Sequence, residues 1–150
     1  MKISFPIVSL LATFLLSGSI YAAEHQVKML NSGANGYMVF EPAVLSVHLG
    51  DTVTFVATDM AHNSASVAGM IPEGASPWYG EISSDITVTF DQTGVYVYQC
   101  TPHAMMAMVG VINVGEGKIN FATIKTAAKK KSTGFVANKE RLDSYLAQLD

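Results

Sequence analysis

The sequence predicts an all-β domain built as a sandwich of short strands, and three observations support this class. Glycine, valine and threonine are frequent and only 14% of the residues are charged, a balance that suits β-sheet. Apolar and polar residues alternate in short runs, most regularly at residues 52–57 and 86–90. Turn-forming residues separate these runs, as at residues 91–94, and regular strands with such turns between them are typical of a β-sandwich.

The first 22 residues have the pattern of a secretory signal peptide. Lys2 gives a positive start, residues 5–16 are almost wholly apolar, and small and polar residues follow up to Ala22. The apolar run is too short for a comfortable membrane span, although an uncleaved anchor is the alternative. We expect cleavage after Ala22, with Ala23 as the next-best site, which leaves residues 23–150 as one soluble, exported domain.

Charge limits the choice of partners for the mature chain. Removing the leader removes Lys2 and no acidic residue, so eight basic and twelve acidic side chains remain, for a net charge of −4. This balance argues against nucleic acid as a partner.

The predicted strands follow one another along the first two thirds of the mature chain. They are residues 25–30, 37–40, 44–49, 52–57, 86–90, 95–100 and 109–114. An irregular stretch at residues 58–78, rich in glycine, proline and asparagine, interrupts the series and is expected to form loops.

The pattern changes from strand to helix at about residue 118, beyond Gly115 and Gly117. Residues 119–128 form a weak helical pattern that ends at lysines 129–131, which suit a helix C-terminus or form a basic docking run. Asn138 is predicted as the N-cap of a second helix. One face of that helix carries Leu142, Tyr145, Leu146 and Leu149. Both helices are too short to stand alone, so we expect them to pack on the sandwich.

The only cysteine begins a short loop that carries metal-binding chemistry. Cys100, His103 and Met108 offer a thiolate, an imidazole and a thioether between two predicted strands, and such soft ligands favour copper, zinc or iron–sulfur centres. A single cysteine excludes a four-cysteine cluster and a cysteine-rich zinc site. A second histidine would complete the set of a blue-copper electron-transfer site. The alternative is a buried free cysteine, a surface histidine and core methionines.

Three other histidines compete for the remaining position. His62 follows a strand end in an apolar stretch and can lean toward the cysteine loop, so it is the best candidate. His48 is expected to point outward from its strand, and His25 lies near the mature terminus, where we expect it to be solvated.

The choice of methionine is less constrained by chemistry alone. Met108 has the longest path back to a metal held by His103 and lies at the start of the next strand. Met105 and Met106 are expected to pack beside the site, and core packing is the alternative for all three.

These motifs resemble the cupredoxin family and, within it, the pseudoazurins. The matching segments are Cys100-Thr101-Pro102-His103 with Met108, Asp59-x-x-His62-Asn63, Met29-Leu30-Asn31, Met38-Val39-Phe40-Glu41-Pro42, Gly50-Asp51-Thr52-Val53-Thr54-Phe55, Met70-Ile71-Pro72-Glu73-Gly74 and Glu140-Arg141-Leu142. The resemblance covers the whole mature chain, including the terminal helices. It implies a Greek-key sandwich of about eight strands. It also implies one type 1 copper ion per chain, held by His62, Cys100, His103 and Met108.

The resemblance further implies residues that support these ligands. The backbone amide of Asn63 would donate to the Cys100 sulfur, and the Asn63 side chain would bind Thr101. Met38 would pack beside the His103 ring. Such neighbours fix the orientation of a ligand and tune its metal.

The functional implication is a single-electron carrier of the periplasm that cycles Cu(II) and Cu(I). Similar proteins often donate electrons to copper nitrite reductase during denitrification, so nitrite reductase and c-type cytochromes are the expected partners, met by weak docking around His103. This chain departs from the family at positions that usually carry lysine. They hold Ser32, Met60, Tyr79 and Gln99, which puts a charge-matched partner in doubt.

Two other functions compete with the carrier. A copper-binding or delivery module would use the same soft ligands. An enzyme with a catalytic cysteine would use His62 or His103 as its base, but the loop offers no separate residue to orient that base. A four-ligand site leaves no position open to a substrate, so we expect no enzymatic activity.

Overall fold

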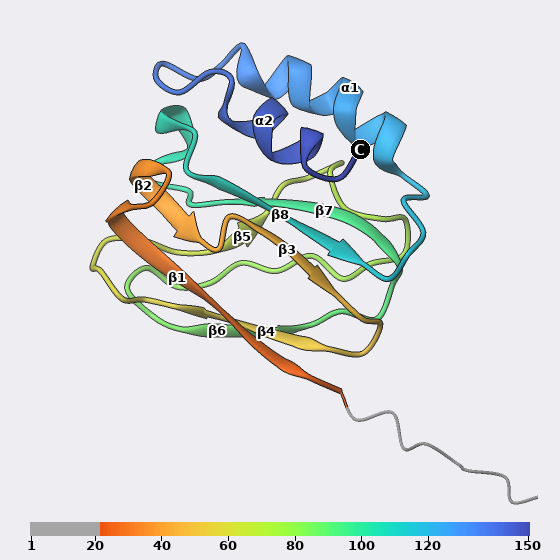
Figure 1. Ribbon diagram of the computed structural model, residues 1–150. Helices are drawn as coiled ribbons and strands as arrows, with labels where there is room; N and C mark the ends of the chain where they lie inside the picture. The colour runs from red at the N-terminus through yellow and green to blue at the C-terminus, as the bar shows by residue number, and fades with distance from the viewer. Residues whose placement is uncertain (1–21) are drawn as a thin grey trace, which may run out of the picture.

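The computed structural model describes residues 22–150, which form two four-stranded sheets packed face to face with two helices on one side (Figure 1). One sheet has the order β2 (Gly36–Glu41), β1 (Glu24–Gly33), β4 (Thr52–Val56), β6 (Ile86–Thr89). The other has the order β3 (Val44–Val47), β8 (Val109–Val114), β7 (Gly94–Gln99), β5 (Ala65–Ser66). The predicted sandwich of eight strands with two C-terminal helices is therefore confirmed.

The expected signal peptide lies almost wholly outside the described residues, so it stays a prediction. Within residues 22–150, neither helix has the length and apolar character needed to cross a membrane.

Strand β7 explains how the sandwich and the helices share one sheet. Its side chains alternate, so that Tyr96 and Tyr98 face the core between the sheets while Val95 and Val97 face the helices. Both faces are buried, which is why this strand is apolar almost throughout.

The two helices cover the outer face of β7 and β8 (Figure 1). They are α1 (Phe121–Ser132) and α2 (Arg141–Ala147). Ile124 and Ala128 of α1 and Leu142 and Leu146 of α2 are buried against the strands, as the helical spacing predicts. The predicted N-cap at Asn138 is wrong, because α2 begins only at Arg141. Asn138 instead has a left-handed backbone with φ of 51°.

A cluster of aromatic rings fills the core between the sheets and packs against the β7–β8 pair. The Tyr98 ring lies edge-on to Phe40 and Phe55, with centroid separations of 4.7 and 4.8 Å. Across the strand pair, Tyr98 is opposite Gly110. A Cβ atom on Gly110 would lie 2.2 Å from the Tyr98 ring, so only glycine fits there.

We expect Gly110→Ala to lower the free energy of unfolding by about 2 kcal/mol, because the fully packed Tyr98 ring must shift to admit a methyl group. Gly117→Ala is the matched control, since its Cβ would meet nothing closer than 3.4 Å. Urea denaturation of both variants measures the difference. Equal stability of Gly110→Ala and the unchanged chain would contradict this account of the core.

Candidate metal centre

The predicted ligand loop joins β7 to β8 and is closed at its base by the backbone. The Cys100 N–H donates to the Met108 carbonyl at 2.9 Å, which continues the hairpin pairing and sets the two ends of the loop side by side. Between them lies the short 3-10 helix η1 (Ala104–Met106). The loop turns back through Ala107, which has a left-handed φ of 57°. The loop therefore holds a fixed shape between rigid strands.

Three predicted ligands meet at this loop. Their ligand atoms, the Cys100 sulfur and the Nδ1 atoms of His62 and His103, all lie within 4.8 Å of one another. The sulfur is 3.7 Å from His62 Nδ1 and 3.4 Å from His103 Nδ1, and the two nitrogens are 3.1 Å apart. Nitrogen and sulfur donors bound to one ion at about 2.0 and 2.3 Å lie roughly 3.5 Å apart. The spacing thus fits one shared metal ion.

The other predicted candidates lie in different surroundings. Met108 is fully buried in the same core cluster as Cys100, whereas Met105 is 61% exposed. The His48 side chain is 90% exposed, as predicted. His25 is not simply solvated, because its Nε2 lies 3.0 Å from a carboxylate oxygen of Asp51.

A chain of hydrogen bonds orients the His62 ring. Its Nε2 lies 2.9 Å from the Asn31 side-chain oxygen, and Asn31 in turn donates its backbone N–H to Asp59 at 2.7 Å. Because an amide oxygen only accepts, Nε2 carries the proton and Nδ1 presents its lone pair toward Cys100. Asn31 lies in a segment that resembles the family, but nothing in the sequence indicated its contact with His62.

The ionisation of these groups reflects their burial. Burial lowers the pKa of His62, the nearby His103 ring lowers it further, and the Asp59 carboxylate opposes both effects. Burial raises the pKa of the Cys100 thiol, although hydrogen bonds from the backbone amides of Asn63 and His103 act in the opposite direction. His62 is thus held in the neutral form that binds a metal. Metal binding would release the Cys100 proton.

Asn63 ties the His62 loop to the ligand loop, as the resemblance predicts. Its side-chain oxygen accepts hydrogen bonds from the Thr101 backbone at 2.8 Å and from the Thr101 hydroxyl at 3.1 Å. Its side-chain nitrogen donates to the Gly80 carbonyl at 3.0 Å. Asn63 therefore connects the loop that carries His62 to the loop that carries Cys100.

The segment around the start of α2 braces the opposite side of the ligand loop. Three successive loop carbonyls accept hydrogen bonds from it: Met105 from Val136 N at 2.8 Å, Met106 from Asn138 Nδ2 at 3.2 Å, and Ala107 from Arg141 Nη1 at 3.0 Å. The residues before α2, together with Arg141 at its start, therefore position the loop that carries the predicted ligands.

Arg141 reaches farthest among these bracing residues. Its buried guanidinium also donates to the carbonyls of Asn35, Tyr37 and Met38, at 3.0 to 3.2 Å, in and beside the β1–β2 turn. One side chain thus joins α2, the β1–β2 turn and the ligand loop. Nothing in the local sequence pattern pointed to this role.

The donor set fits copper. One cysteine sulfur and two imidazole nitrogens meet here, and the Met108 thioether is buried in the same core cluster as Cys100. Such soft and borderline donors are the ligands of copper electron-transfer sites.

Comparison with known proteins agrees with this chemistry. Residues 27–115 match the family described as copper binding proteins of the plastocyanin/azurin family. The chain is 39% identical to the pseudoazurin of Paracoccus pantotrophus over 139 residues, which covers 93% of this chain and 92% of that one. The solved pseudoazurin of Methylobacterium extorquens AM1 has a TM-score of 0.75 and 38% identity, covering 85% of this chain and 99% of that chain. A solved Sinorhizobium pseudoazurin has a TM-score of 0.74 and 44% identity, with 85% and 97% covered.

We expect Arg141→Met to lower the free energy of unfolding by about 3 kcal/mol, because four backbone carbonyls, that of Ala107 in a buried hydrogen bond, lose a charged donor. Arg141→Lys keeps the charge, but one ammonium group cannot reach both loops. Its free energy of unfolding should therefore lie between those of Arg141→Met and the unchanged chain. Urea denaturation measures stability, and amide hydrogen exchange reports whether the ligand loop opens more often.

Lys139→Met serves as the control, because this neighbouring cation is exposed. If Arg141→Met leaves both the stability and the exchange of the ligand loop unchanged, the bracing role of Arg141 is wrong.

Proposed function

Because this chain belongs to the plastocyanin/azurin family of copper-binding proteins, we propose that it is a single-electron carrier whose copper is held by His62, Cys100, His103 and Met108. The observation that carries the proposal is the meeting of one cysteine sulfur and two histidine Nδ1 atoms within 4.8 Å. Bound copper would supply a one-electron couple between Cu(II) and Cu(I). The protein's own contribution is to keep the same ligand positions in both states.

The rigidity of the site supports a carrier. Cys100 and Met108 are joined through the hairpin base, and Asn63 links Thr101 to the His62 loop. A site that moves little when its charge changes by one needs little reorganisation. Such pre-set geometry is what favours fast electron exchange.

Burial distinguishes the carrier from its two competitors. Cys100 and His62 are fully buried, which hinders the ligand exchange that a copper-delivery module needs. The raised pKa of the Cys100 thiol opposes a catalytic cysteine, since reactive cysteines have a lowered pKa.

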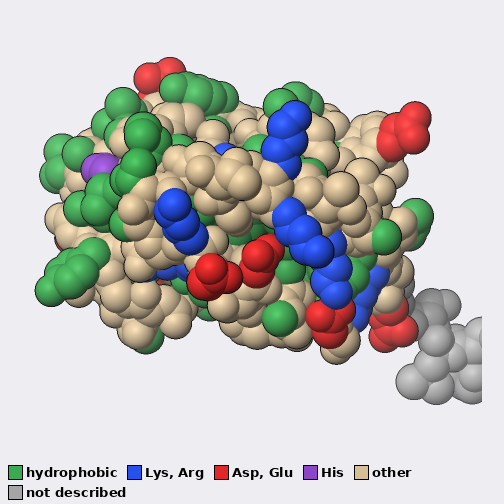
Figure 2. Space-filling model, turned by 90° about the horizontal axis from the view of Figure 1, so that it is seen from above, with side chains coloured by type: hydrophobic (Ala, Val, Ile, Leu, Met, Phe, Trp, Pro, Cys, Tyr) green, Lys and Arg blue, Asp and Glu red, His purple; other side chains and the backbone are tan. Residues whose placement is uncertain are grey.

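An apolar surface around His103 is the proposed docking site. His103 is partly exposed while the other three predicted ligands are buried. Figure 2 shows hydrophobic side chains gathered around a histidine at the end of the molecule where β2 lies in Figure 1. Large exposed hydrophobic residues on segments near the ligands are Tyr37 of β2 and, outside the named strands, Met60, Tyr79 and Met105. Small apolar surfaces of this kind suit short-lived redox encounters.

Charge near the docking site comes from a helix. Lys131 of α1 donates to the Gln99 side chain at 2.5 Å and lies over the Phe135 ring. Gln99 is one of the positions where the resemblance leads us to expect lysine. Burial lowers the pKa of Lys131, and its ammonium is already engaged. We infer that it steers partners only weakly.

The cellular setting is proposed from the leader and the relatives. We propose that residues 1–22 are removed on export and that the mature domain works in the periplasm. Copper nitrite reductase and c-type cytochromes are the proposed partners, in keeping with the similarity to pseudoazurins along nearly the whole chain.

The first test is the colour of the copper-loaded protein. We expect an intense thiolate-to-copper absorption band that Cys100→Ser abolishes and His62→Ala severely weakens, because both changes remove a ligand. His48→Ala is the matched control and should leave the visible spectrum unchanged, since that ring is exposed. Bleaching by His48→Ala combined with survival of the band in His62→Ala would show that the histidine assignment is wrong.

The second test concerns docking. We expect Met105→Lys to slow electron transfer to the physiological partner by about tenfold, because a charge in the centre of an apolar contact costs on the order of 1.4 kcal/mol. The visible spectrum should not change. Stopped-flow rates should also depend only weakly on salt, because apolar contact is not screened as charge steering is.

Ile119→Lys is the control for net charge. Ile119 is 80% exposed and lies near Thr93, at the end of β7 away from the ligand loop. If Ile119→Lys slows transfer as much as Met105→Lys, or if the rate falls steeply with added salt, charge rather than apolar contact guides the encounter.

A further inference from the structure

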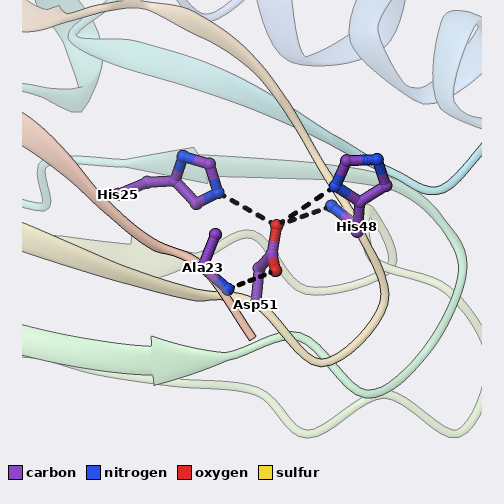
Figure 3. Close-up of polar contacts among 4 residues, drawn as sticks. All are labelled: Ala23, His25, His48 and Asp51. Atoms are coloured by element: carbon purple, nitrogen blue, oxygen red, sulfur yellow. Dashed lines mark hydrogen bonds and ion pairs between the residues drawn. The ribbon is translucent and has the colours of Figure 1, made fainter. Parts of the chain in front are cut away.

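Asp51 precedes β4, at the end of the strand away from His62. Its buried carboxylate binds Ala23 and His25, the first and third residues of the expected mature chain. Oδ1 accepts a hydrogen bond from Ala23 N at 2.8 Å, and Oδ2 accepts one from His48 N at 2.8 Å (Figure 3). His25 Nε2 lies 3.0 Å from Oδ2, and it must donate because a carboxylate only accepts. These contacts lower the pKa of Asp51 to about 2, and the hydrogen bond from His25 has the largest effect. Asp51 is therefore charged under all ordinary conditions.

Processing changes what Asp51 binds. In the uncleaved chain Ala23 N is a peptide amide. Cleavage after Ala22, which is part of the proposed function, converts it into an α-ammonium group placed on a buried carboxylate. Hydrogen bonds between charged groups are roughly twice as strong as neutral ones. Ala23 is also fixed through its carbonyl, which accepts from Thr52 N at 2.9 Å.

The same cleavage makes Ala23-Glu24-His25 the first three residues. An α-amine, two backbone amides and a histidine ring at the third position can surround one ion with four nitrogens in a plane. Cu(II) and Ni(II) favour such square-planar nitrogen ligands. Binding releases the protons of the amine and of the two amides, so it competes with any group that stabilises the protonated amine.

The folded arrangement and this metal complex exclude one another. Asp51 holds the Ala23 nitrogen and the His25 ring, and Glu24 and His25 pair in parallel with Thr52 and Val53 of β4. A metal ion needs the backbone nitrogens of Glu24 and His25, so the first three residues must leave the sheet to form the complex.

We propose that the mature amino terminus is a latent binding site for Cu(II) or Ni(II), and that Asp51 keeps it closed by holding the α-ammonium group and His25. While the terminus is closed, copper binds at the proposed centre formed by His62 and the ligand loop. If the site is open in only a small fraction of molecules, its apparent Kd equals the Kd of the open site divided by that fraction.

The position of cleavage is tested first. The full chain is expressed with its leader, and the exported protein is analysed by intact mass and N-terminal sequencing. We expect Ala23 as the first residue. A chain that begins at Glu24, or one that keeps its leader, cannot form the site and overturns the proposal.

Binding is tested with Ni²⁺ as the probe on the mature chain carrying Cys100→Ser, so that the thiolate of the main centre is absent. We expect Asp51→Asn to tighten Ni²⁺ binding at the terminus by about tenfold or more, because charged hydrogen bonds no longer hold the closed state. Isothermal titration measures the affinity, and the yellow colour of square-planar Ni(II) identifies the complex.

Controls separate the terminus from other sites. His25→Ala and acetylation of the α-amine should each abolish the yellow complex. His48→Ala should not, because the exposed His48 ring, which lies 3.7 Å from Asp51 Oδ2, is outside the first three residues and supplies none of the four nitrogens. A free peptide of residues 23–27 measures the affinity of the open site without any folding requirement. The folded Asp51 chain should bind Ni²⁺ about tenfold or more weakly than this peptide.

Either of two results overturns the proposal: equal Ni²⁺ affinity for the folded Asp51 chain and the peptide, or a peptide that forms no square-planar complex. Neither result affects the proposed electron carrier, which depends on the thiolate band of the Cys100 chain. Loss of that band would in turn leave the Ni²⁺ measurements intact.

Discussion

A single buried cation holds together the parts of this chain that shape the metal centre. The guanidinium of Arg141 on α2 donates to carbonyls of both the β1–β2 turn and the ligand loop. A charge removed from water is unfavourable unless dipoles of the right sign surround it. Those dipoles belong to two loops that are distant in sequence, so the helix, the turn and the loop must adopt their conformations together.

The sandwich and most of the candidate site could be predicted because both depend on short-range patterns. Alternation at residues 52–57 and 86–90 predicted two strands, and β4 and β6 lie within these ranges. Cys100 and His103 lie on one tight loop between strands, so their proximity follows from spacing alone. The position of His62 just beyond a strand was enough to favour it over the other histidines.

The remaining features could not be predicted because they depend on contacts between distant segments. Asn31 binds His62 across 31 residues, and Arg141 binds Met38 across 103. Asn138 has the local signature of an N-cap, but tertiary contacts direct its side chain to the Met106 carbonyl. His25 likewise looked solvated until the strand pairing placed it on Asp51. In each case the residue type is clear from the sequence and only its partner is missing.

The bracing of the ligand loop has a consequence for how such a chain can change over evolution. An insertion between His103 and Met108 would shift three carbonyls out of register with their donors at residues 136–141. A compensating change in residues 136–141 would be needed to restore these three hydrogen bonds. The ligand loop and the link between the helices should therefore vary in length as a pair in descendants of this sequence, while the strands beneath can diverge independently.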